Sequence, residues 1–348
     1  MAEAFLAAPG DLGTQTGGYA YDRRVLELLG SYGITCRHLE LPGSVPAPTP
    51  ADIEDSVQPL AATPADAPPV IDGLAYGAMP AEAIARIGRR ILALVHHPLC
   101  LEAGLSTARA ADLRTIETAA LALASHTIVT SPATARLLAA EFAVPADRIT
   151  IAEPGTDPAT RATGTGTPLQ LLAVGAISPR KGYDVLVTAL GPLRELDWRL
   201  TIAGATDRHP QAVAAIRQAI AAAGLGDKIT LAGTVVPATL ERFYASADLF
   251  LMPSLFEGYG MVLAEAMARG LPIVCTTGGA AAETVPDTAA LKVPPGDVEA
   301  LGRALVLAMS DRKLRARLAD ASWEAGRRLP TWNETARRIA AVILEIPQ

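Results

Sequence analysis

The sequence predicts an α/β protein built from two doubly wound domains. Its 348 residues are half hydrophobic and 19% charged, which is enough for two domains with separate cores. Short apolar runs alternate with amphipathic helical segments, the pattern of parallel strands covered by helices. We expect domains at 1–155 and 169–330, a linker rich in Gly, Thr and Pro at 156–168, and a final helix at 331–348.

Composition and charge indicate which partners and which cellular compartment to expect. The net charge of −6 gives no electrostatic reason to expect a nucleic-acid partner. Cys36, Cys100 and Cys275 lie far apart, without metal-binding spacing, as expected for thiols in a reducing compartment. The first nine residues lack the basic region and long apolar run of a signal peptide, and no apolar stretch reaches the length of a membrane span. We therefore expect a cytoplasmic protein.

The most informative stretch is 248–276. An apolar run at 249–252 predicts a buried strand that stops at Pro253. A loop with two glycines follows, then a short Ala- and Met-rich helix over about 260–269, which Gly270-Leu-Pro ends. The next buried strand opens at Ile273.

Two carboxylates in this stretch predict a ligand site. Glu265 lies among apolar residues of the helix, where an ionised carboxylate is costly unless something pairs with it. Glu257 precedes the helix, and the free N–H groups of the first turn suit an anion. Sugar hydroxyls and a phosphate fit this combination. The alternative is structural, with Glu257 preceding or capping the helix and Glu265 paired to an arginine elsewhere.

The run EGYGMVLAEAMARGLPIV from Glu257 to Val274 resembles the Glu-x7-Glu signature of retaining nucleotide-sugar glycosyltransferases of family 4, also called glycosyl transferases group 1. The resemblance is good over about 168–330 and looser before it. It implies the GT-B fold, in which two Rossmann-like domains face each other across a cleft and the last helix crosses back to the first domain. It also implies that Glu257 holds sugar hydroxyls and Glu265 the ribose hydroxyls. The remaining donor-binding residues that it implies here are Gly258, Tyr259, Gly260, Met261 and Val262, with Gly233 beside the nucleotide base.

The second domain also carries two adjacent cations after its first strand, at 169–174. Arg180 and Lys181 lie on the loop before the next helix, where they suit a diphosphate; a solvated basic turn is the alternative. Many members of the family have Gly-Arg just after this strand and Lys-Gly further on. Lys181 matches the lysine, whereas Ala176 stands where the arginine is expected. Either Arg180 substitutes for that arginine or the phosphate clamp is weaker.

The first domain opens as a nucleotide-binding α/β unit does. A strand at 5–8 leads through a Gly-rich stretch into a helix over about 19–30. The glycines permit close approach of a ligand, or simply a tight turn. In the resembling family a Gly-rich loop here faces the donor phosphates, which implies that role for Gly17 and Gly18.

Three further candidates follow strands of the first domain. Asp72, His96 and His97 stand at strand ends, where ligands bind in open α/β sheets, so we expect them to converge on one crevice. A histidine there can donate to a hydroxyl or position an acceptor. Capping or a metal site are the alternatives, but a metal needs a third ligand and none is apparent nearby. The resemblance implies that a His or Asp at such a strand end contacts the donor sugar, and His96 matches best.

Residues 42–69, rich in Pro, Ala, Thr and Asp, predict the least regular segment, which has room for one short helix. Ser131 before Pro132 predicts a helix N-cap rather than a site residue. Arg86, Arg89 and Arg90 form a small basic cluster that suits either a solvated helix face or anionic lipid headgroups, which leaves a peripheral membrane contact open.

The resemblance implies a retaining transferase that moves a hexose from a UDP- or GDP-sugar to a lipid, glycan or small-molecule acceptor. No Asp-x-Asp motif occurs, so we expect no metal requirement and no cofactor besides the co-substrate. The alternatives are a non-catalytic GT-B protein that binds nucleotide sugars and a nucleotide-sugar epimerase on the same fold.

Overall fold

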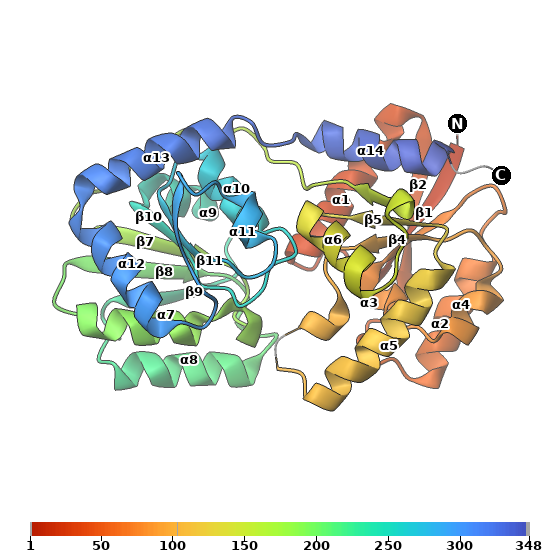
Figure 1. Ribbon diagram of the computed structural model, residues 1–348, viewed down its shortest axis with the longest axis horizontal. Coiled ribbons are helices and arrows are strands. Elements are labelled where there is room, and N and C mark those ends of the chain that lie inside the picture. Colours follow the sequence, from red (N-terminus) through yellow and green to blue (C-terminus); the bar gives the residue numbers. More distant parts are fainter. Residues whose placement is uncertain (1, 103, 346–348) are drawn as a thin grey trace. The chain divides into compact units, whose positions relative to one another are not determined.

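The computed structural model describes residues 2–102 and 104–345. The chain divides into two compact units (Figure 1). Unit 1 comprises the residues up to Gly155 together with those from Pro330 onward, and unit 2 comprises Thr156–Leu329. Each unit holds a six-stranded sheet covered by helices, which confirms the predicted α/β class and its two doubly wound sheets.

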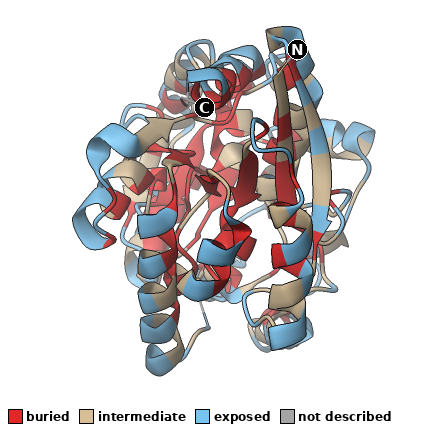
Figure 2. Cartoon of the chain, turned by 90° about the vertical axis from the view of Figure 1, so that its right-hand side faces the viewer, coloured by how far each residue is buried: buried red, intermediate tan, exposed pale blue. Residues whose placement is uncertain are grey.

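The sheet of unit 1 is parallel throughout, with the strand order β2-β1-β3-β4-β5-β6. Its order changes direction at β1, so the loops after β1 and β3 leave a crevice between them at their carboxyl ends. In Figure 2 the buried residues concentrate in the central strands, while the outer faces of the helices are exposed. The strands are β1 (Ala2–Pro9), β2 (Ile34–Leu41), β3 (Pro69–Asp72), β4 (Leu92–Val95), β5 (His126–Val129) and β6 (Ile149–Ile151).

Two helices of unit 1 depend on local capping. The one helix in the segment at 42–69 has 12 residues and is longer than expected, because Thr49 and Asp52 form a reciprocal capping box with Pro50 in the first turn. A short helix follows Asp72 directly, and the Asp72 side chain caps its first turn. Ser131 caps its helix as predicted. The helices are α1 (Gly17–Leu29), α2 (Pro50–Ala61), α3 (Gly73–Tyr76), α4 (Ala81–Ile87), α5 (Thr107–Leu123), α6 (Pro132–Glu141) and α14 (Trp332–Glu345), with 3-10 turns η1 (Gly30–Tyr32), η2 (Leu99–Leu101) and η3 (Ala146–Arg148).

The last helix, α14, packs on α1 and β6 within unit 1 (Figure 1). The rings of Tyr21 and Trp332 meet edge to face, with their centroids 5.9 Å apart. The hydroxyl of Thr335 donates to the carbonyl of Glu153 at 2.6 Å, which anchors the helix to the strand end. Gly155 lies so close to this helix that an added Cβ would be 2.2 Å from the backbone nitrogen of Trp332.

The sheet of unit 2 is also parallel, with the order β12-β11-β10-β7-β8-β9. Its first strand, β7, lies in the middle, and the chain builds outward to one side and then to the other. The reversal occurs between β7 and β10, which makes this the ligand-binding position of a doubly wound sheet. The strands are β7 (Leu169–Val174), β8 (Trp198–Ala203), β9 (Ile229–Gly233), β10 (Leu249–Met252), β11 (Ile273–Thr276) and β12 (Ala290–Val293); the sequence analysis had not included β12.

Helices cover both faces of this sheet. Leu249 and Leu251 of β10 belong to the core beneath α7 and α12, whereas Phe250 and Met252 belong to the core beneath α10. Strands buried on both faces explain the continuous apolar runs in the sequence. The helices are α7 (Tyr183–Leu190), α8 (Pro210–Ala222), α9 (Pro237–Ser246), α10 (Met261–Ala268), α11 (Ala281–Thr284), α12 (Val298–Ser310) and α13 (Arg312–Gly326), with 3-10 turns η4 (Pro179–Lys181) and η5 (Gly191–Leu193).

The segment at 156–168 has no regular secondary structure and belongs to unit 2. The Asp248 carboxylate accepts hydrogen bonds from the backbone N–H groups of Gly166 and Gln170, at 3.0 and 2.8 Å. Ala162 donates its N–H to the carbonyl of Arg269 at 2.8 Å. The segment is therefore bound to its own unit along its length.

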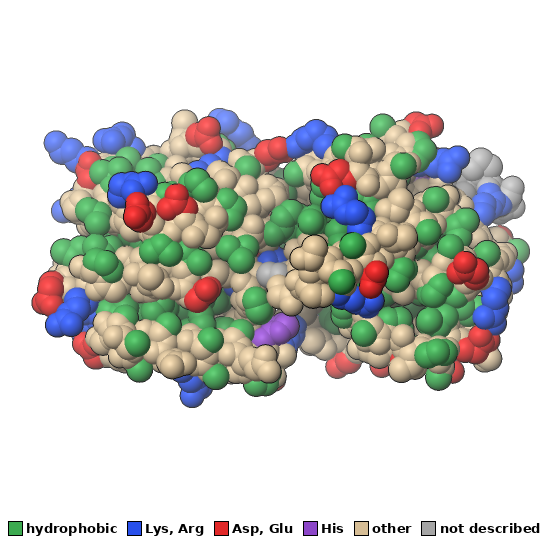
Figure 3. Space-filling model, turned by 60° about the horizontal axis from the view of Figure 1, so that its bottom comes forward, with side chains coloured by type: hydrophobic (Ala, Val, Ile, Leu, Met, Phe, Trp, Pro, Cys, Tyr) green, Lys and Arg blue, Asp and Glu red, His purple; other side chains and the backbone are tan. Residues whose placement is uncertain are grey.

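The helices and the surface charges both bear on the question of a membrane contact. Within residues 2–102 and 104–345, no helix combines the length and apolar character needed to cross a bilayer. Charges of both signs are interspersed over the face drawn in Figure 3. In the basic cluster, Arg86 pairs with Glu54 at 2.7 Å and Arg89 donates to the carbonyl of Thr63 at 2.7 Å.

We predict that Gly155→Ala destabilises unit 1 by about 1–3 kcal/mol, because the new methyl group overlaps the backbone at the start of α14. Urea denaturation followed by circular dichroism measures the change. Gly30→Ala is the matched control, since no atom lies within 4 Å of a Cβ at Gly30. Equal midpoints for the two variants would contradict the prediction.

Candidate functional site

The loops after β7 and β10 are held together at the switch point of unit 2. Leu255 donates its N–H to the carbonyl of Arg180 at 2.8 Å, which joins the two loops. Gly182 has a φ of +62°, and a Cβ there would lie 2.3 Å from the carbonyl oxygen of Pro253. Only glycine fits this left-handed, crowded position. The Arg180–Lys181 segment therefore lies directly against the loop that carries Glu257.

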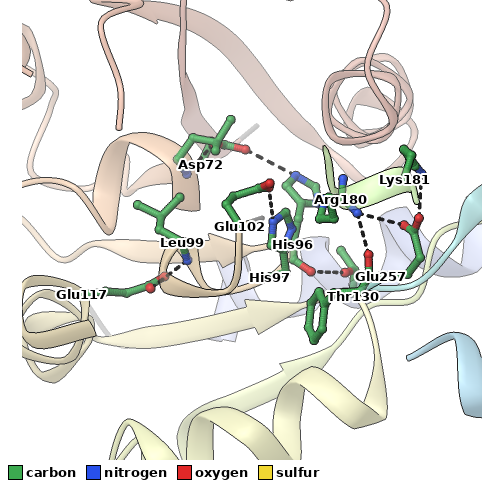
Figure 4. Close-up of polar contacts among 12 residues, drawn as sticks. Asp72, His96, His97, Leu99, Glu102, Glu117, Thr130, Arg180, Lys181 and Glu257 are labelled. Carbon is green, nitrogen blue, oxygen red and sulfur yellow. Dashed lines mark hydrogen bonds and ion pairs between the residues drawn. The ribbon is translucent and has the colours of Figure 1, made fainter. Parts of the chain in front are cut away.

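Arg180, Lys181 and Glu257 form a compact ion cluster (Figure 4). Lys181 Nζ lies 2.6 Å from Glu257 Oε1, and Arg180 Nη1 lies 3.3 Å from Oε2. The same Nη1 donates to the carbonyl of Phe256 at 2.8 Å. The exposed fractions of the Arg180, Lys181 and Glu257 side chains are only 18, 14 and 8%.

This environment keeps Glu257 ionised. Burial alone would raise its pKa, but the charges of Lys181 and Arg180, with the hydrogen bond from Lys181, outweigh it and lower the pKa to about 2. Two cations facing one carboxylate leave an excess of positive charge, which suits an anionic ligand. Glu257 itself offers acceptors for hydroxyl groups.

The backbone of Glu257 is held by the loop after β11. Glu257 donates its N–H to the carbonyl of Gly278 at 3.2 Å, and Ala280 donates to the carbonyl of Glu257 at 2.8 Å. A Cβ on Gly279 would lie 2.3 Å from that same carbonyl oxygen. The sequence analysis did not include Gly278 and Gly279 in the site, although a Gly-Gly pair after a strand is a signal for close backbone approach.

Helix α10 begins immediately after the loop that follows β10 and carries Glu257. Gly260, at φ +92°, precedes the helix, and its Cβ position is crowded by Leu263. Gly258 and Tyr259 are buried, and the Tyr259 carbonyl accepts a hydrogen bond from Thr284 at 2.6 Å. Met261 and Val262 are half-buried in the first turn. In β9, the carbonyl of Gly233 accepts a hydrogen bond from Gly204 at 2.9 Å.

The partner of Glu265 is a tyrosine. The Tyr244 hydroxyl donates to Glu265 Oε2 at 2.7 Å. Arg269 donates to the backbone carbonyl of Glu265 at 2.9 Å, and its guanidinium lies over the Tyr244 ring and pairs with Glu241. Burial raises the pKa of Glu265, against the lowering effect of Tyr244 and Arg269. The side chain is half-buried, so one face of it can still meet a ligand.

In unit 1, the glycines after β1 lie against a strand-end histidine. Gly17 and Gly18 open α1, and the Thr16 hydroxyl accepts a hydrogen bond from the N–H of Tyr19 at 3.0 Å. A Cβ on Gly18 would lie 3.3 Å from Cδ2 of His96. Gly18 therefore lets the loop pack directly on the imidazole ring.

His96 lies between two buried aspartates. Its Nε2 is 3.3 Å from an oxygen of Asp22 and 3.3 Å from an oxygen of Asp72, and both aspartate side chains are 0% exposed (Figure 4 shows the contact with Asp72). The expectation that no third group lies near this site was wrong, because Asp22 of α1 reaches it. Asp22 lies on the same stripe of α1 as Val25 and Leu29, so an acid on the buried face of an amphipathic helix was the missed signal.

These three groups have the donor chemistry of a cation site. Their ligand atoms lie within 4.8 Å of one another. However, zinc sites use four ligands and magnesium or calcium sites six or more. Both oxygens of Asp22 and Oδ2 of Asp72 are buried. Among the residues that the structure describes, the cluster is short of ligands for a metal.

His97 does not join this cluster. Its Nε2 lies 2.5 Å from Oε1 of Glu102, in the following loop. Asp72 and His96 therefore converge as expected from their strand ends, whereas His97 has a separate partner.

Comparison with known proteins finds sequence similarity mainly in unit 2. Residues 168–311 match the family model for glycosyl transferases group 1. Mannosylfructose-phosphate synthase of Agrobacterium fabrum is 32% identical over 180 residues, which cover 50% of this chain and 40% of that protein. The lipopolysaccharide core biosynthesis mannosyltransferase LpsB of Rhizobium meliloti is 33% identical over 196 residues, which cover 54% of this chain and 52% of that protein. The match thus spans about half of these relatives' length or less.

Solved structures extend the likeness in fold to the whole chain. Sucrose-phosphate synthase from Thermosynechococcus elongatus has a TM-score of 0.82 at 20% identity, covering 99% of both chains. Anabaena Alr3699/HepE in complex with UDP-glucose has a TM-score of 0.77 at 17% identity, covering 98% of this chain and 100% of that one. The fold is thus the GT-B fold of glycosyltransferases. Residues 168–311, less than half of the chain, are similar to the glycosyl transferases group 1 family.

Proposed function

We propose that the chain is a retaining glycosyltransferase that transfers a hexose from a nucleotide-sugar donor to an acceptor hydroxyl. The observation that carries this proposal is the cluster of Arg180, Lys181 and Glu257 at the switch point of unit 2. It combines cations for a diphosphate with a buried, ionised carboxylate for hydroxyl groups.

The diphosphate of the donor replaces Glu257 as the partner of Lys181. Lys181 and Arg180 then face the phosphate oxygens, together with the free N–H groups at the start of α10. This arrangement supplies positive charge where the leaving group develops negative charge, which stabilises the transition state. Ala176 stands where the family has an arginine. Because Arg180 already lies beside Lys181, we propose that Arg180 supplies the positive charge of that arginine. The two side chains then neutralise the diphosphate without a metal ion.

The two glutamates divide the donor between them. Once Lys181 turns to the diphosphate, Glu257 accepts hydrogen bonds from sugar hydroxyls. Glu265, oriented by the Tyr244 hydroxyl, accepts hydrogen bonds from the ribose hydroxyls. The Anabaena protein with the same fold was solved with UDP and with UDP-glucose, which supports a UDP-sugar as the first donor to test.

The reaction we propose retains the configuration at the anomeric carbon. The bond between C1 and the phosphate oxygen breaks, and the acceptor oxygen bonds to C1 on the same face. The acceptor proton passes to the departing phosphate oxygen, so no protein base is needed. Lys181 and Arg180 neutralise the charge on the diphosphate that leaves.

The acceptor is a lipid, a glycan or a small molecule, and we place it on unit 1, beside His96. We propose that the protein acts in the cytoplasm or at the inner face of the membrane. The names of the relatives cover phosphorylated sugars, inositol 3-phosphate and lipopolysaccharide core, which supports a polyhydroxylated acceptor. A protein that only binds nucleotide sugars is the second candidate, and donor turnover separates the two.

We predict that Lys181→Met and Glu265→Gln each weaken binding of the matching nucleotide at least about tenfold, because each removes one charged contact. Thermal-shift titrations with UDP, GDP and ADP and their hexose conjugates, with and without EDTA, measure this. Lys313→Met, an exposed lysine of α13, is the control. Stabilisation that vanishes with EDTA would contradict metal-free binding, and no stabilisation by any nucleotide would contradict the function.

We predict that slow hydrolysis of the preferred donor releases the hexose with the anomeric configuration of the donor, since water can replace the acceptor on the same face. Proton NMR recorded within minutes of mixing distinguishes the two anomers before they equilibrate. Release of the opposite anomer would contradict retention. Donor binding without any turnover, also in the presence of polyol acceptors, would favour the non-catalytic candidate.

We predict that Glu257→Gln lowers the free energy of unfolding by about 3 kcal/mol at pH 7, because it leaves two buried cations without their counter-charge. The folded pKa of Glu257, about 2, lies below the ordinary value of 4.5. Its stabilisation is therefore complete above pH 4.5 and is lost as the pH falls towards 2. Urea denaturation from pH 7 to 3 should show the difference between wild type and variant shrinking. Glu299→Gln, at a side chain 89% exposed, is the control, and a difference independent of pH would disprove the ionised state.

A further inference from the structure

The contacts around His96 define which way its ring faces. Nε2 is closed to solvent and points to the two aspartates, and Cδ2 lies against Gly18. The Tyr21 ring packs on the imidazole edge to face, with centroids 5.3 Å apart. Yet 19% of the side chain is exposed. The opposite edge, which carries Nδ1, is therefore the edge left for a ligand.

Two carboxylates compete for one ring nitrogen. Both contacts of Nε2 measure 3.3 Å, and neither is sufficiently in line to count as a full hydrogen bond. Both oxygens of Asp22 and one of Asp72 have no hydrogen-bond partner among the described residues. The other oxygen of Asp72 caps the N–H of Leu74 at 2.7 Å. What holds the two aspartates at His96 is therefore charge more than hydrogen bonding.

The charged and titratable groups around the ring are few. Tyr21 and Asp22 face it from α1, Asp72 faces it from β3, and the Thr130 hydroxyl donates to the His96 carbonyl. The positive charge of Arg23 lowers the pKa of Asp22. With a neutral ring, two buried carboxylates would face each other unneutralised, which is a costly arrangement.

We propose that Asp22 and Asp72 are positioning residues that hold His96 as a doubly protonated imidazolium, so that Nδ1–H is a permanent hydrogen-bond donor at the strand end. Its use towards the hydroxyls of a bound sugar rests on the proposed function. His96 then binds and orients the sugar and does not act as a general base.

The direction of the pKa shifts agrees with this geometry. Burial on its own lowers the pKa of His96, but the two carboxylates that face its Nε2 outweigh this effect and raise the pKa above its usual value. Burial raises the pKa of Asp22, against the lowering effect of His96. His96 therefore stays protonated in the range where an ordinary histidine, with a pKa near 6.5, loses its proton.

The proposal can be tested without substrate. The protein has five histidines, so 15N-histidine labelling with His96→Gln assigns the two nitrogens of His96 in long-range proton–nitrogen spectra. We expect both nitrogens protonated at pH 7.5. A neutral ring at that pH would overturn the proposal. So would a selective change of the His96 signals on addition of MnCl2, because a cation would then occupy the place of the proton.

The variant Asp22→Asn tests the positioning role. We expect the titration midpoint of His96 to fall by at least about one pH unit, because one of its two counter-charges is gone. Asp112→Asn, at an exposed position of α5, is the matched control and should leave the midpoint unchanged. An unchanged midpoint in Asp22→Asn would overturn the role of Asp22. If this variant does not fold, the wild-type titration still decides the protonation state.

Binding of a nucleotide sugar distinguishes an electrostatic role of Asp22 from a purely structural one. At a pH between the His96 midpoints measured for Asp22→Asn and for wild type, we expect Asp22→Asn to weaken nucleotide-sugar binding about tenfold and the nucleotide alone not at all, with recovery below the variant's own midpoint, where His96 regains its proton. A loss independent of pH would indicate a merely structural role and overturn the proposal. If wild-type protein binds no nucleotide sugar, the proposed function fails, while the NMR result for His96 still stands on its own.

Discussion

The reversal of strand order in each parallel sheet is the constraint on which the rest of this structure depends. Because β7 lies in the middle of its sheet, the chain leaves it in one direction and later returns on the other side at β10. The loops that follow these two strands cannot both be covered by helices, so polar groups can gather there. The cluster of Arg180, Lys181 and Glu257 occupies that position, and the pair of Asp72 and His96 occupies the strand ends of unit 1.

Both clusters use the same physical principle with opposite charges. In unit 2 two cations surround one buried carboxylate and lower its pKa; in unit 1 two buried carboxylates surround one imidazole and raise the pKa of the ring. Each cluster is strongly charged and screened from water, and each is an arrangement that folding alone would not favour over apolar packing. Such arrangements concentrate at functional sites, which agrees with the transferase that we propose.

The sequence predicted the fold well because alternating apolar runs and helices are local signals. It also predicted the approach of Asp72 and His96, since strand position is enough to place them. Asp22, Tyr244 and the Gly278–Gly279 pair were not predicted. An acid on the buried stripe of α1 and a Gly-Gly pair after a strand are local signals, but the groups that they contact depend on tertiary packing. Tyr244 comes from a different helix than Glu265, and spacing along the chain does not join the two. The capped helix α2 was underestimated because its Thr49–Asp52 capping box was overlooked.

The return of α14 to unit 1 has a consequence for biosynthesis. Unit 2 is one continuous stretch of chain, whereas unit 1 needs residues from both sides of it. As the chain leaves the ribosome, the residues up to Gly155 emerge first, yet the surface of α1 that Trp332 covers stays bare until the last helix appears. Unit 1, which is made first, is therefore completed last, after unit 2 has already had time to fold.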